Sequence, residues 1–303
     1  LQDLLRVRAP QPDARESAMS ELAGTLTGLG YFETVTFSFV SHDHAAPFLP
    51  SELKTIQVSD DRRKAEPVLR PSPLASLLSC RRANQDAGVS PEGGVRLYEV
   101  SAVFGETTQG KSVEHRNLAL LADTPAPGKA GTIDHLQTGL RLVRGTIEQL
   151  VRRLGGRFAD LKIAPADVST PAFDADGHAS VTIGGGLLGH IGLLSAETLS
   201  AYDLDRPVVA AELNVDRLLA LYPPAGGVDA LPVFPAIERD VSLVLAENVA
   251  WGDVAGLIEG CQLDGLDGYA FVATYRGKQI GAGRKSVTAR LRFRDQTRTL
   301  RHE

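Results

Sequence analysis

Seven basic residues near the end of the sequence have the types and spacing that suit phosphate binding. Arg290, Arg292 and Arg294 alternate with apolar residues in segment 286–294, which predicts a strand with three guanidinium groups on one face. The glycine-rich turn before this strand adds Arg276, Lys278, Arg284 and Lys285. Guanidinium groups bind phosphate through paired donors and stack on unpaired bases. The pattern therefore predicts a continuous basic surface for RNA; a merely solvated strand face is the alternative.

The distribution of charge along the chain favours the RNA-binding interpretation. The whole sequence of 303 residues has a net charge of −5. Residues 274–303 nevertheless hold nine Lys/Arg and two Asp/Glu, whereas the remainder holds 23 Lys/Arg and 35 Asp/Glu. A local excess of this kind indicates an anionic partner that binds at one place.

The other reactive side chains form no recognisable catalytic or metal-binding motif. The histidines lack metal spacing, and the group His42, Asp43 and His44 is better explained as an exposed turn. Gly184, Gly185 and Gly186 predict a hairpin turn and not a phosphate loop. The two cysteines are far apart in the sequence, and no apolar run is long enough to span a bilayer. A reducing, cytoplasmic location with no membrane contact is expected.

Apolar periodicity predicts an α+β arrangement upstream of the basic segment. Helices are expected at 13–29, 67–84, 137–155, 196–202 and 215–221, and strands at 34–40, 95–104, 117–123, 179–183, 187–193 and 208–213. Strand 34–40 is expected to be half-buried, with Val35, Phe37 and Phe39 on its apolar face. Met19, Leu22 and Phe37 are expected in a core or at a subunit interface.

The proline- and glycine-rich stretch after Tyr222 predicts a domain boundary. We expect one domain at 1–222, a linker at 223–230 and a second domain at 231–303. In the second domain, strand 239–245, helix 251–260, strand 267–275 and strand 286–294 follow the order of a ferredoxin-like split βαβ unit. The helix and edge strand that would complete this unit are not in the sequence, so the domain is expected to be truncated.

Three segments of the second domain resemble the ferredoxin-fold anticodon-binding domain of bacterial phenylalanyl-tRNA synthetase β subunits. They are 234–245 (FPAIERDVSLVL), 275–280 (YRGKQI) and 285–295 (KSVTARLRFRD). Segments upstream resemble the catalytic-like domain of the same subunit: 30–40, 68–78, 96–104, 188–194 and 210–216. The resemblance therefore covers nearly the whole chain.

The resemblance implies a class II synthetase-like antiparallel sheet with flanking helices, followed by the truncated ferredoxin-like domain. It implies a non-catalytic part of phenylalanine–tRNA ligase, inactive alone, that supports the α subunit in an (αβ)₂ assembly and binds tRNA(Phe). The seven basic residues named above are the expected tRNA contacts. No catalytic residue, metal site or cofactor is expected in this chain, because ATP and magnesium belong to the complete enzyme.

The residues themselves also argue against adenylate chemistry. Arg96 and Glu99 lie where a class II enzyme grips ATP, but no second arginine follows in the glycine-containing segment 184–194. A transferred adenylate develops negative charge that calls for paired cations. Two alternatives remain at this point: a self-standing RNA-binding or interaction protein, and, less favoured, an independent adenylate-forming enzyme.

Overall fold

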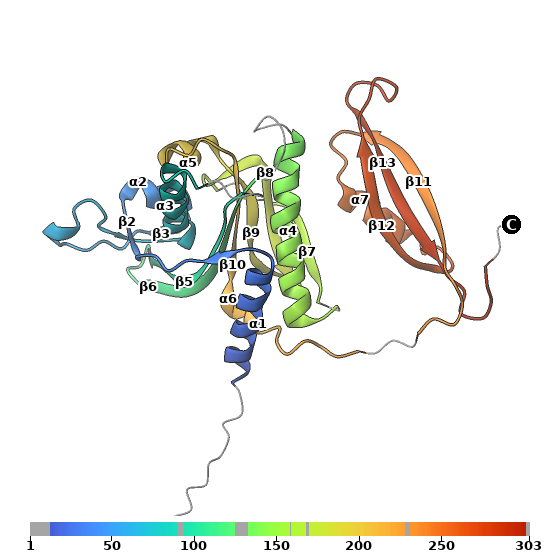
Figure 1. Cartoon of the computed structure of the whole chain (residues 1–303), viewed down its shortest axis with the longest axis horizontal. Coiled ribbons are helices and arrows are strands. Elements are labelled where there is room, and N and C mark those ends of the chain that lie inside the picture. Colours follow the sequence, from blue (N-terminus) through green and yellow to red (C-terminus); the bar gives the residue numbers. More distant parts are fainter. Residues whose placement is uncertain are drawn as a thin grey trace, which may run out of the picture. The chain divides into compact units, whose positions relative to one another are not determined.

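The computed structural model describes residues 13–89, 94–124, 133–157, 159–167, 170–227 and 231–300. The chain divides into two compact units, unit 1 (Leu1–Gly226) and unit 2 (Gly227–Glu303), shown in Figure 1. The division falls inside the stretch where the sequence predicts a linker. No helix among the described residues is long and apolar enough to cross a membrane.

Unit 1 is built on a large, mostly antiparallel sheet in the order β1-β5-β6-β10-β9-β8-β7, with β3 also paired to β5. The strands are β1 (Phe32–Glu33), β3 (Leu53–Lys54), β5 (Arg96–Thr107), β6 (Ser112–Asp123), β7 (Leu161–Pro165), β8 (Phe173–Ile183), β9 (Gly186–Leu194) and β10 (Val208–Asn214). The predicted glycine turn joins β8 to β9, and Gly184 and Gly185 have the positive φ that such a turn requires. Among the described strands of this sheet, only the short β1 runs parallel to its neighbour.

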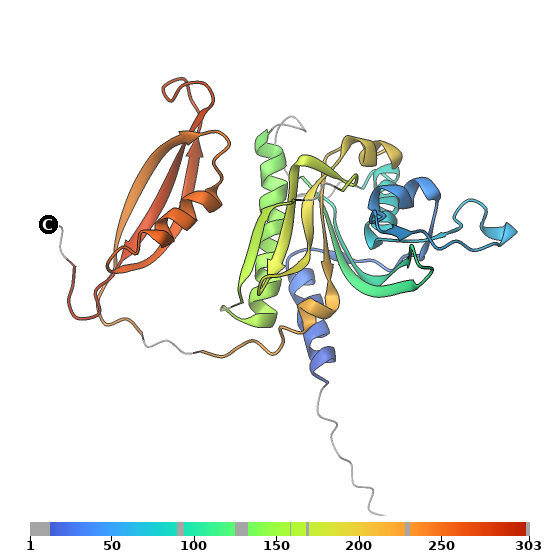
Figure 2. The ribbon, with the colours of Figure 1, turned by 180° about the vertical axis from the view of Figure 1, so that it is seen from behind.

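Helices cover both faces of this sheet (Figures 1 and 2). One face packs against α1 (Ala14–Gly28), α4 (Ile133–Gly155) and α6 (Val215–Leu219), with Leu22, Leu26 and Ile147 fully buried. The opposite face packs against α3 (Pro73–Asp86) through Leu74, Leu77 and Leu78. The short elements of this unit are α2 (His42–Ala45), η1 (Ala46–Phe48), η2 (Asp61–Arg63), α5 (Ala196–Ala201), β2 (Phe39–Val40) and β4 (Val68–Leu69).

The prediction of a half-buried strand at 34–40 is wrong for residues 34–38 and holds only for Phe39 and Val40, which form β2. Residues 34–38 form no strand, and the side chains of Val35 and Phe37 are 94% and 82% exposed. Backbone groups at the two ends of this segment form hydrogen bonds outside a regular strand pair. The Thr34 N–H donates to the Tyr98 carbonyl, and the Ser38 carbonyl accepts from the Arg70 N–H. Leu22 is buried and Met19 packs against the core, but Phe37 is not a core residue of this chain.

The helix predicted at 67–84 begins later, at Pro73. Ser72 caps it, since its side chain accepts a hydrogen bond from the Leu74 backbone N–H. Pro73 occupies the first turn, where a backbone N–H has no hydrogen-bond partner within the helix, so the N–H that proline lacks is not needed. Val68 and Leu69 before it form β4, which pairs with β2. Pro71 and Pro73 disfavour helix at Arg70 and Ser72, the residues directly before them, so the helix cannot extend back through this segment.

Unit 2 is a three-stranded antiparallel sheet in the order β11-β13-β12 with one helix. Its elements are β11 (Ile237–Ala246), α7 (Trp251–Gly260), β12 (Leu266–Tyr275) and β13 (Arg284–Phe293), which confirms the predicted β-α-β-β order. Figure 2 shows α7 across one face, where Val254, Val287 and Ala289 are buried. Residues 301–303, where the sequence predicts only the start of a further helix, lie outside the described residues.

Candidate nucleic-acid interface

The second face of the unit 2 sheet is open, and β13 places the predicted arginines on it. Val287 and Ala289 point toward α7, whereas Arg290 and Arg292 alternate with them and are exposed. Across the ladder, Arg290 lies opposite Asp240 of β11, and Arg292 lies opposite Glu238. Residues opposite one another on antiparallel strands share a face. The open face therefore carries acidic as well as basic side chains.

The expectation of an uninterrupted basic surface is wrong. Arg290 binds the Asp240 carboxylate through Nε and Nη2 at 2.7 and 2.9 Å, and lies 3.6 Å from Glu238. Arg292 and Arg294 share the Asp267 carboxylate at 3.0 and 3.1 Å. The hydrogen bond from Arg290 lowers the pKa of Asp240, so this carboxylate stays ionised at neutral pH. Three guanidinium groups thus face three carboxylates, and their charges largely cancel.

The turn between β12 and β13 holds the net positive charge of this region. Arg276 forms a bidentate pair with Glu247, and Lys285 donates to the Glu247 carbonyl at 2.6 Å. Lys278 and Arg284 are exposed, and neither makes an ion pair with another described residue. Lys278 and Arg284, which have no ion pair among the described residues, therefore leave an excess of positive charge at this end of the sheet.

Tyr275 belongs to the same surface and was not predicted as a site residue. It is the last residue of β12, lies opposite Ser286 of β13 and is 55% exposed. Its register places it on the open face with Arg290, and the next residue, Arg276, begins the basic turn. An exposed aromatic ring beside cations is a stacking platform for a nucleic-acid base. An aromatic residue directly before a basic turn was the sequence signal that could have identified it.

Arg96 and Glu99 of unit 1 are engaged in structural contacts. Arg96 donates from Nη1 to the Leu29 carbonyl at 2.8 Å. Glu99 is 3% exposed and forms a buried ion pair with Arg70 at 2.9 Å. Thr36 also donates to the Glu99 carboxylate, so this group has little capacity left for a ligand.

A separate cleft of about 760 Å³ lies over β6, β9 and β10 of unit 1. Glu212 lines it and accepts hydrogen bonds from Ser72 and Asn117, both at 2.5 Å. Burial raises the pKa of the Glu212 carboxyl, and these two hydrogen bonds act in the opposite direction. Arg217, the arginine that lines this cleft, donates to the Leu187 carbonyl. This geometry supplies one partly buried acid and no cation pair among the described lining residues.

The histidine group near the end of β2 lies in a short helix and not in the exposed turn that the sequence predicted. His42, Asp43 and His44 form the short helix α2, and the His44 ring stacks on Tyr202 at 4.0 Å. No cluster of three or more possible metal ligands occurs among the described residues.

Comparison with known proteins assigns both units to families. Residues 5–215 match the phenylalanyl tRNA synthetase beta chain CLM domain, and residues 232–303 match the ferredoxin-fold anticodon binding domain. The second match agrees with the ferredoxin-like order of strands and helix in unit 2.

Individual relatives of the chain are phenylalanine–tRNA ligase beta subunits. The chain is 30% identical to the phenylalanine–tRNA ligase beta subunit of Rhodopirellula baltica and 26% identical to that of Desulfotalea psychrophila, over 96% and 98% of its length. It spans 42% and 38% of the length of these relatives. It is also similar to a pyrrolysyl-tRNA synthetase of Desulfitobacterium hafniense (TM-score 0.49, 16% identity, 69% of each chain), a likeness too weak to bear on function. From the two family matches, this chain belongs to the phenylalanyl-tRNA synthetase β-chain family.

Proposed function

We propose that the chain forms part of a phenylalanine–tRNA ligase β subunit, in which unit 2 binds tRNA(Phe) and unit 1 packs against the catalytic α subunit. The observation that carries this proposal is the open face of unit 2, where Tyr275 and three arginines lie within a domain of the anticodon-binding family. Single-stranded RNA is commonly bound on such a face by aromatic stacking and arginine contacts.

The carboxylates beside the arginines do not prevent this role. The Arg290–Asp240 pair is exposed on both sides, with 45% and 44% of the side chains accessible. Exposed ion pairs contribute only about 0–1 kcal/mol, so an RNA phosphate can replace Asp240 at small cost. Lys278, Arg284 and Lys285 of the turn supply the net attraction, and we assign them the larger share of the binding free energy.

An exposed apolar segment supports the packing of unit 1 on another subunit. Phe32, Val35 and Phe37 are 69%, 94% and 82% exposed within six residues of sequence. Large apolar side chains gathered at the surface indicate a protein interface. We assign this segment to the contact with the α subunit, within an (αβ)₂ assembly in the cytoplasm.

We further propose that this chain does not activate phenylalanine. Arg96 is held by Leu29 and Glu99 by Arg70, so the residues where a class II enzyme grips ATP serve the fold. The cleft above β10 offers Glu212 and a tethered Arg217, whereas adenylate transfer calls for paired cations. ATP and magnesium belong to the complete enzyme, and ATP–pyrophosphate exchange by the isolated chain would contradict this part of the proposal.

The RNA-binding part is tested by filter binding of the full chain to a tRNA(Phe) transcript at several salt concentrations. Changing Lys278, Arg284 and Lys285 together to Gln is expected to lower affinity by roughly tenfold and to reduce the salt slope by about 2. Changing Arg290, Arg292 and Arg294 together is expected to have the smaller effect, because their charges are already offset. Lys54, Lys64 and Lys111, three exposed lysines of unit 1, provide a control of equal charge when changed to Gln. Equal losses in all three variants would refute the assignment to unit 2.

A further inference from the structure

The cleft of about 760 Å³ over β6, β9 and β10 in unit 1 combines a largely apolar lining with a few polar side chains. The polar ones come from neighbouring strands and include Asn117, His190 and Glu212. Segments far apart in the sequence supply the apolar ones, among them Phe48, Leu49, Val103, Phe104, Phe173 and Leu187. Sites for small molecules have this composition and volumes of about 300–1,000 Å³.

Glu212 of β10 brings a carboxyl group into this apolar lining. One of its oxygens accepts a hydrogen bond from Ser72 and the other accepts one from Asn117, both at 2.5 Å. An ionised carboxylate can accept about four hydrogen bonds. Roughly two acceptor sites are therefore left for a ligand that donates hydrogen bonds.

The charge of Glu212 is not balanced within the described part of the chain. Both of its hydrogen-bond donors are neutral, and no described cation forms an ion pair with it. Arg70 acts on Glu212 through space, but it pairs with Glu99 at 2.9 Å. This group of three thus holds two carboxylates and one guanidinium. A buried ionised carboxylate without a counter-charge is costly, and burial accordingly raises the pKa of Glu212.

The other ionisable groups of the cleft do not supply the counter-charge. His190 lies opposite Glu212 in the β9–β10 ladder, and burial lowers its pKa, so its ring is neutral at neutral pH. Burial also lowers the pKa of His115. Glu52 and Arg217 are both exposed, and their opposite charges cancel in the sum. The described lining residues are thus left with the negative charge of Glu212.

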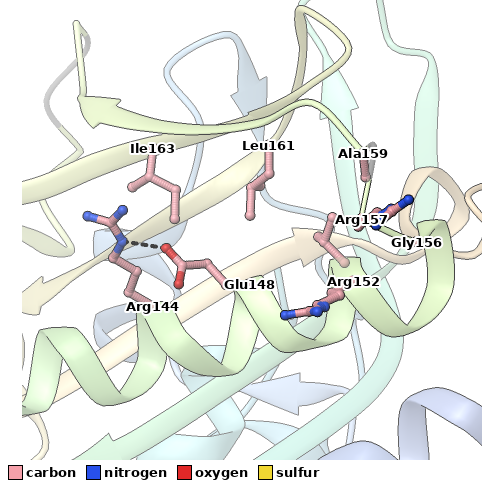
Figure 3. Close-up of a pocket in the computed structure, with 9 residues that line it drawn as sticks. Arg144, Glu148, Arg152, Gly156, Arg157, Ala159, Leu161 and Ile163 are labelled. Carbon is pink, nitrogen blue, oxygen red and sulfur yellow. Dashed lines mark hydrogen bonds and ion pairs between the residues drawn. The ribbon is translucent and has the colours of Figure 1, made fainter. Parts of the chain in front are cut away.

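The smaller groove of unit 1 shows the opposite arrangement. It lies between α4 and β7 and has a volume of about 440 Å³ (Figure 3). Its acidic lining residue, Glu148, pairs with Arg144 on the same helix at 2.7 Å. Glu148 therefore has its counter-charge within the chain, whereas Glu212 has none among the described residues.

We propose that the cleft over β6, β9 and β10 binds a small molecule that carries an ammonium group on an apolar body. The ammonium group supplies three hydrogen-bond donors and one positive charge, which match the open acceptor sites and the missing counter-charge of Glu212. The apolar body packs against Phe48, Leu49 and Phe104. The inference does not rest on the proposed function, because it concerns neither tRNA nor the contact with another subunit.

A purely structural role is the plain alternative for Glu212. Ser72 caps α3 and also donates to Glu212, so this carboxyl group links the helix to the sheet. A carboxyl group that served only this contact would be neutral, and it would not distinguish an amine from an alcohol of the same shape. The preference between two such ligands therefore separates the two roles.

The test is a ligand-observed NMR titration of the full chain at pH 8 with four matched probes. These are 2-phenylethylamine, 2-phenylethanol, 3-phenylpropionate and phenylalanine. The amine is expected to bind on the order of tenfold more tightly than the alcohol, since hydrogen bonds between charged partners are the stronger ones. The propionate is expected to bind most weakly. Phenylalanine adds a carboxylate beside the same ammonium group and is expected to bind several-fold more weakly than the amine.

Four variants locate the effect, with circular dichroism to verify folding. Glu212→Gln is expected to bring the ratio of amine to alcohol affinity close to one while the alcohol still binds. Leu187→Arg places a cation at a cleft position that is 48% exposed in the parent chain, and it should lower the same ratio even if Glu212→Gln does not fold. Leu187→Gln is its neutral control. Glu197→Gln removes an exposed carboxylate of α5 outside the cleft and should leave the ratio unchanged.

Other results would overturn the proposal. Equal affinities of the amine and the alcohol for the parent chain, or no binding of any probe, would leave Glu212 with the structural role alone. Equal changes in Glu212→Gln and Glu197→Gln would indicate a general charge effect. Phenylalanine binding as tightly as the amine would indicate a site for amino acids. None of these results bears on tRNA binding by unit 2, which the filter-binding titration measures separately.

Discussion

Both units contain arginine–carboxylate pairs, but the Arg70–Glu99 pair of unit 1 is buried, whereas the Arg290–Asp240 and Arg292–Asp267 pairs of unit 2 are exposed. Arg70 and Glu99 have 2% and 4% of their side chains accessible, whereas Arg290 and Arg292 have 45% and 48%. Arg70 also donates to Thr36 and Ser76, so its guanidinium is surrounded by protein acceptors. Among the described residues, the partners of Arg290 are carboxylates, and solvent reaches them.

An ion pair can therefore either stabilise a fold or place a charged group where a ligand can bind it. Loss of one member of a buried pair leaves a charge without compensation, which is costly. An exposed pair contributes little to stability and exchanges its carboxylate for another anion at small cost. The buried Arg70–Glu99 pair is therefore structural, whereas the exposed pairs of Arg290 and Arg292 can be replaced by phosphate contacts.

The largest expected effect comes from breaking the buried pair. Glu99→Gln leaves the Arg70 charge uncompensated and should lower the unfolding free energy of unit 1 by about 3–5 kcal/mol. Urea denaturation followed by far-UV circular dichroism measures this loss. Trp251 is the one tryptophan of the sequence and lies in unit 2, so its fluorescence reports that unit separately. Glu238→Gln in unit 2 is the comparison and should lower the unfolding free energy of that unit by less than about 1 kcal/mol. Similar losses in the two variants would contradict the distinction between buried and exposed ion pairs.

An intermediate effect is expected when the exposed carboxylates of unit 2 are neutralised. Asp240→Asn with Asp267→Asn releases Arg290, Arg292 and Arg294 from their partners and should tighten tRNA binding by on the order of tenfold at low salt. The same filter-binding titration measures it. Asp264→Asn, an exposed acidic residue of unit 2 with no ion pair among the described residues, should have little effect. An unchanged affinity in the double variant would place RNA away from this face.

The smallest expected effect is a difference between the units in their response to pH. Burial lowers the pKa of His115, His178 and His190, all in unit 1. When the pH falls below about 6.5, the unfolded state takes up protons before the folded state does, so unit 1 loses stability. Its unfolding midpoint should fall by a few degrees between pH 7 and pH 5. Unit 2 has a single histidine, His302, and the tryptophan-monitored transition should move less.

Local pattern predicted the elements with strong periodicity. The apolar stripe of Leu22 and Leu26 specified α1, and the alternation of Val287, Ala289 and the arginines specified β13. The strand prediction failed at Val35 and Phe37, which alternate with polar residues but are exposed. The same alternation is also compatible with a surface that another subunit can cover. Periodicity indicates which residues share a face, but not whether this chain itself supplies the contact for that face.

The sequence by itself determined the family, the order of elements in unit 2 and the identity of its basic residues. The tertiary structure determined which carboxylates lie opposite those basic residues. Unit 2 contains ten Lys/Arg and ten Asp/Glu, separated along the chain but brought together when β11 and β12 pair with β13. The potential at a surface depends on distances in space, which a local charge count does not contain.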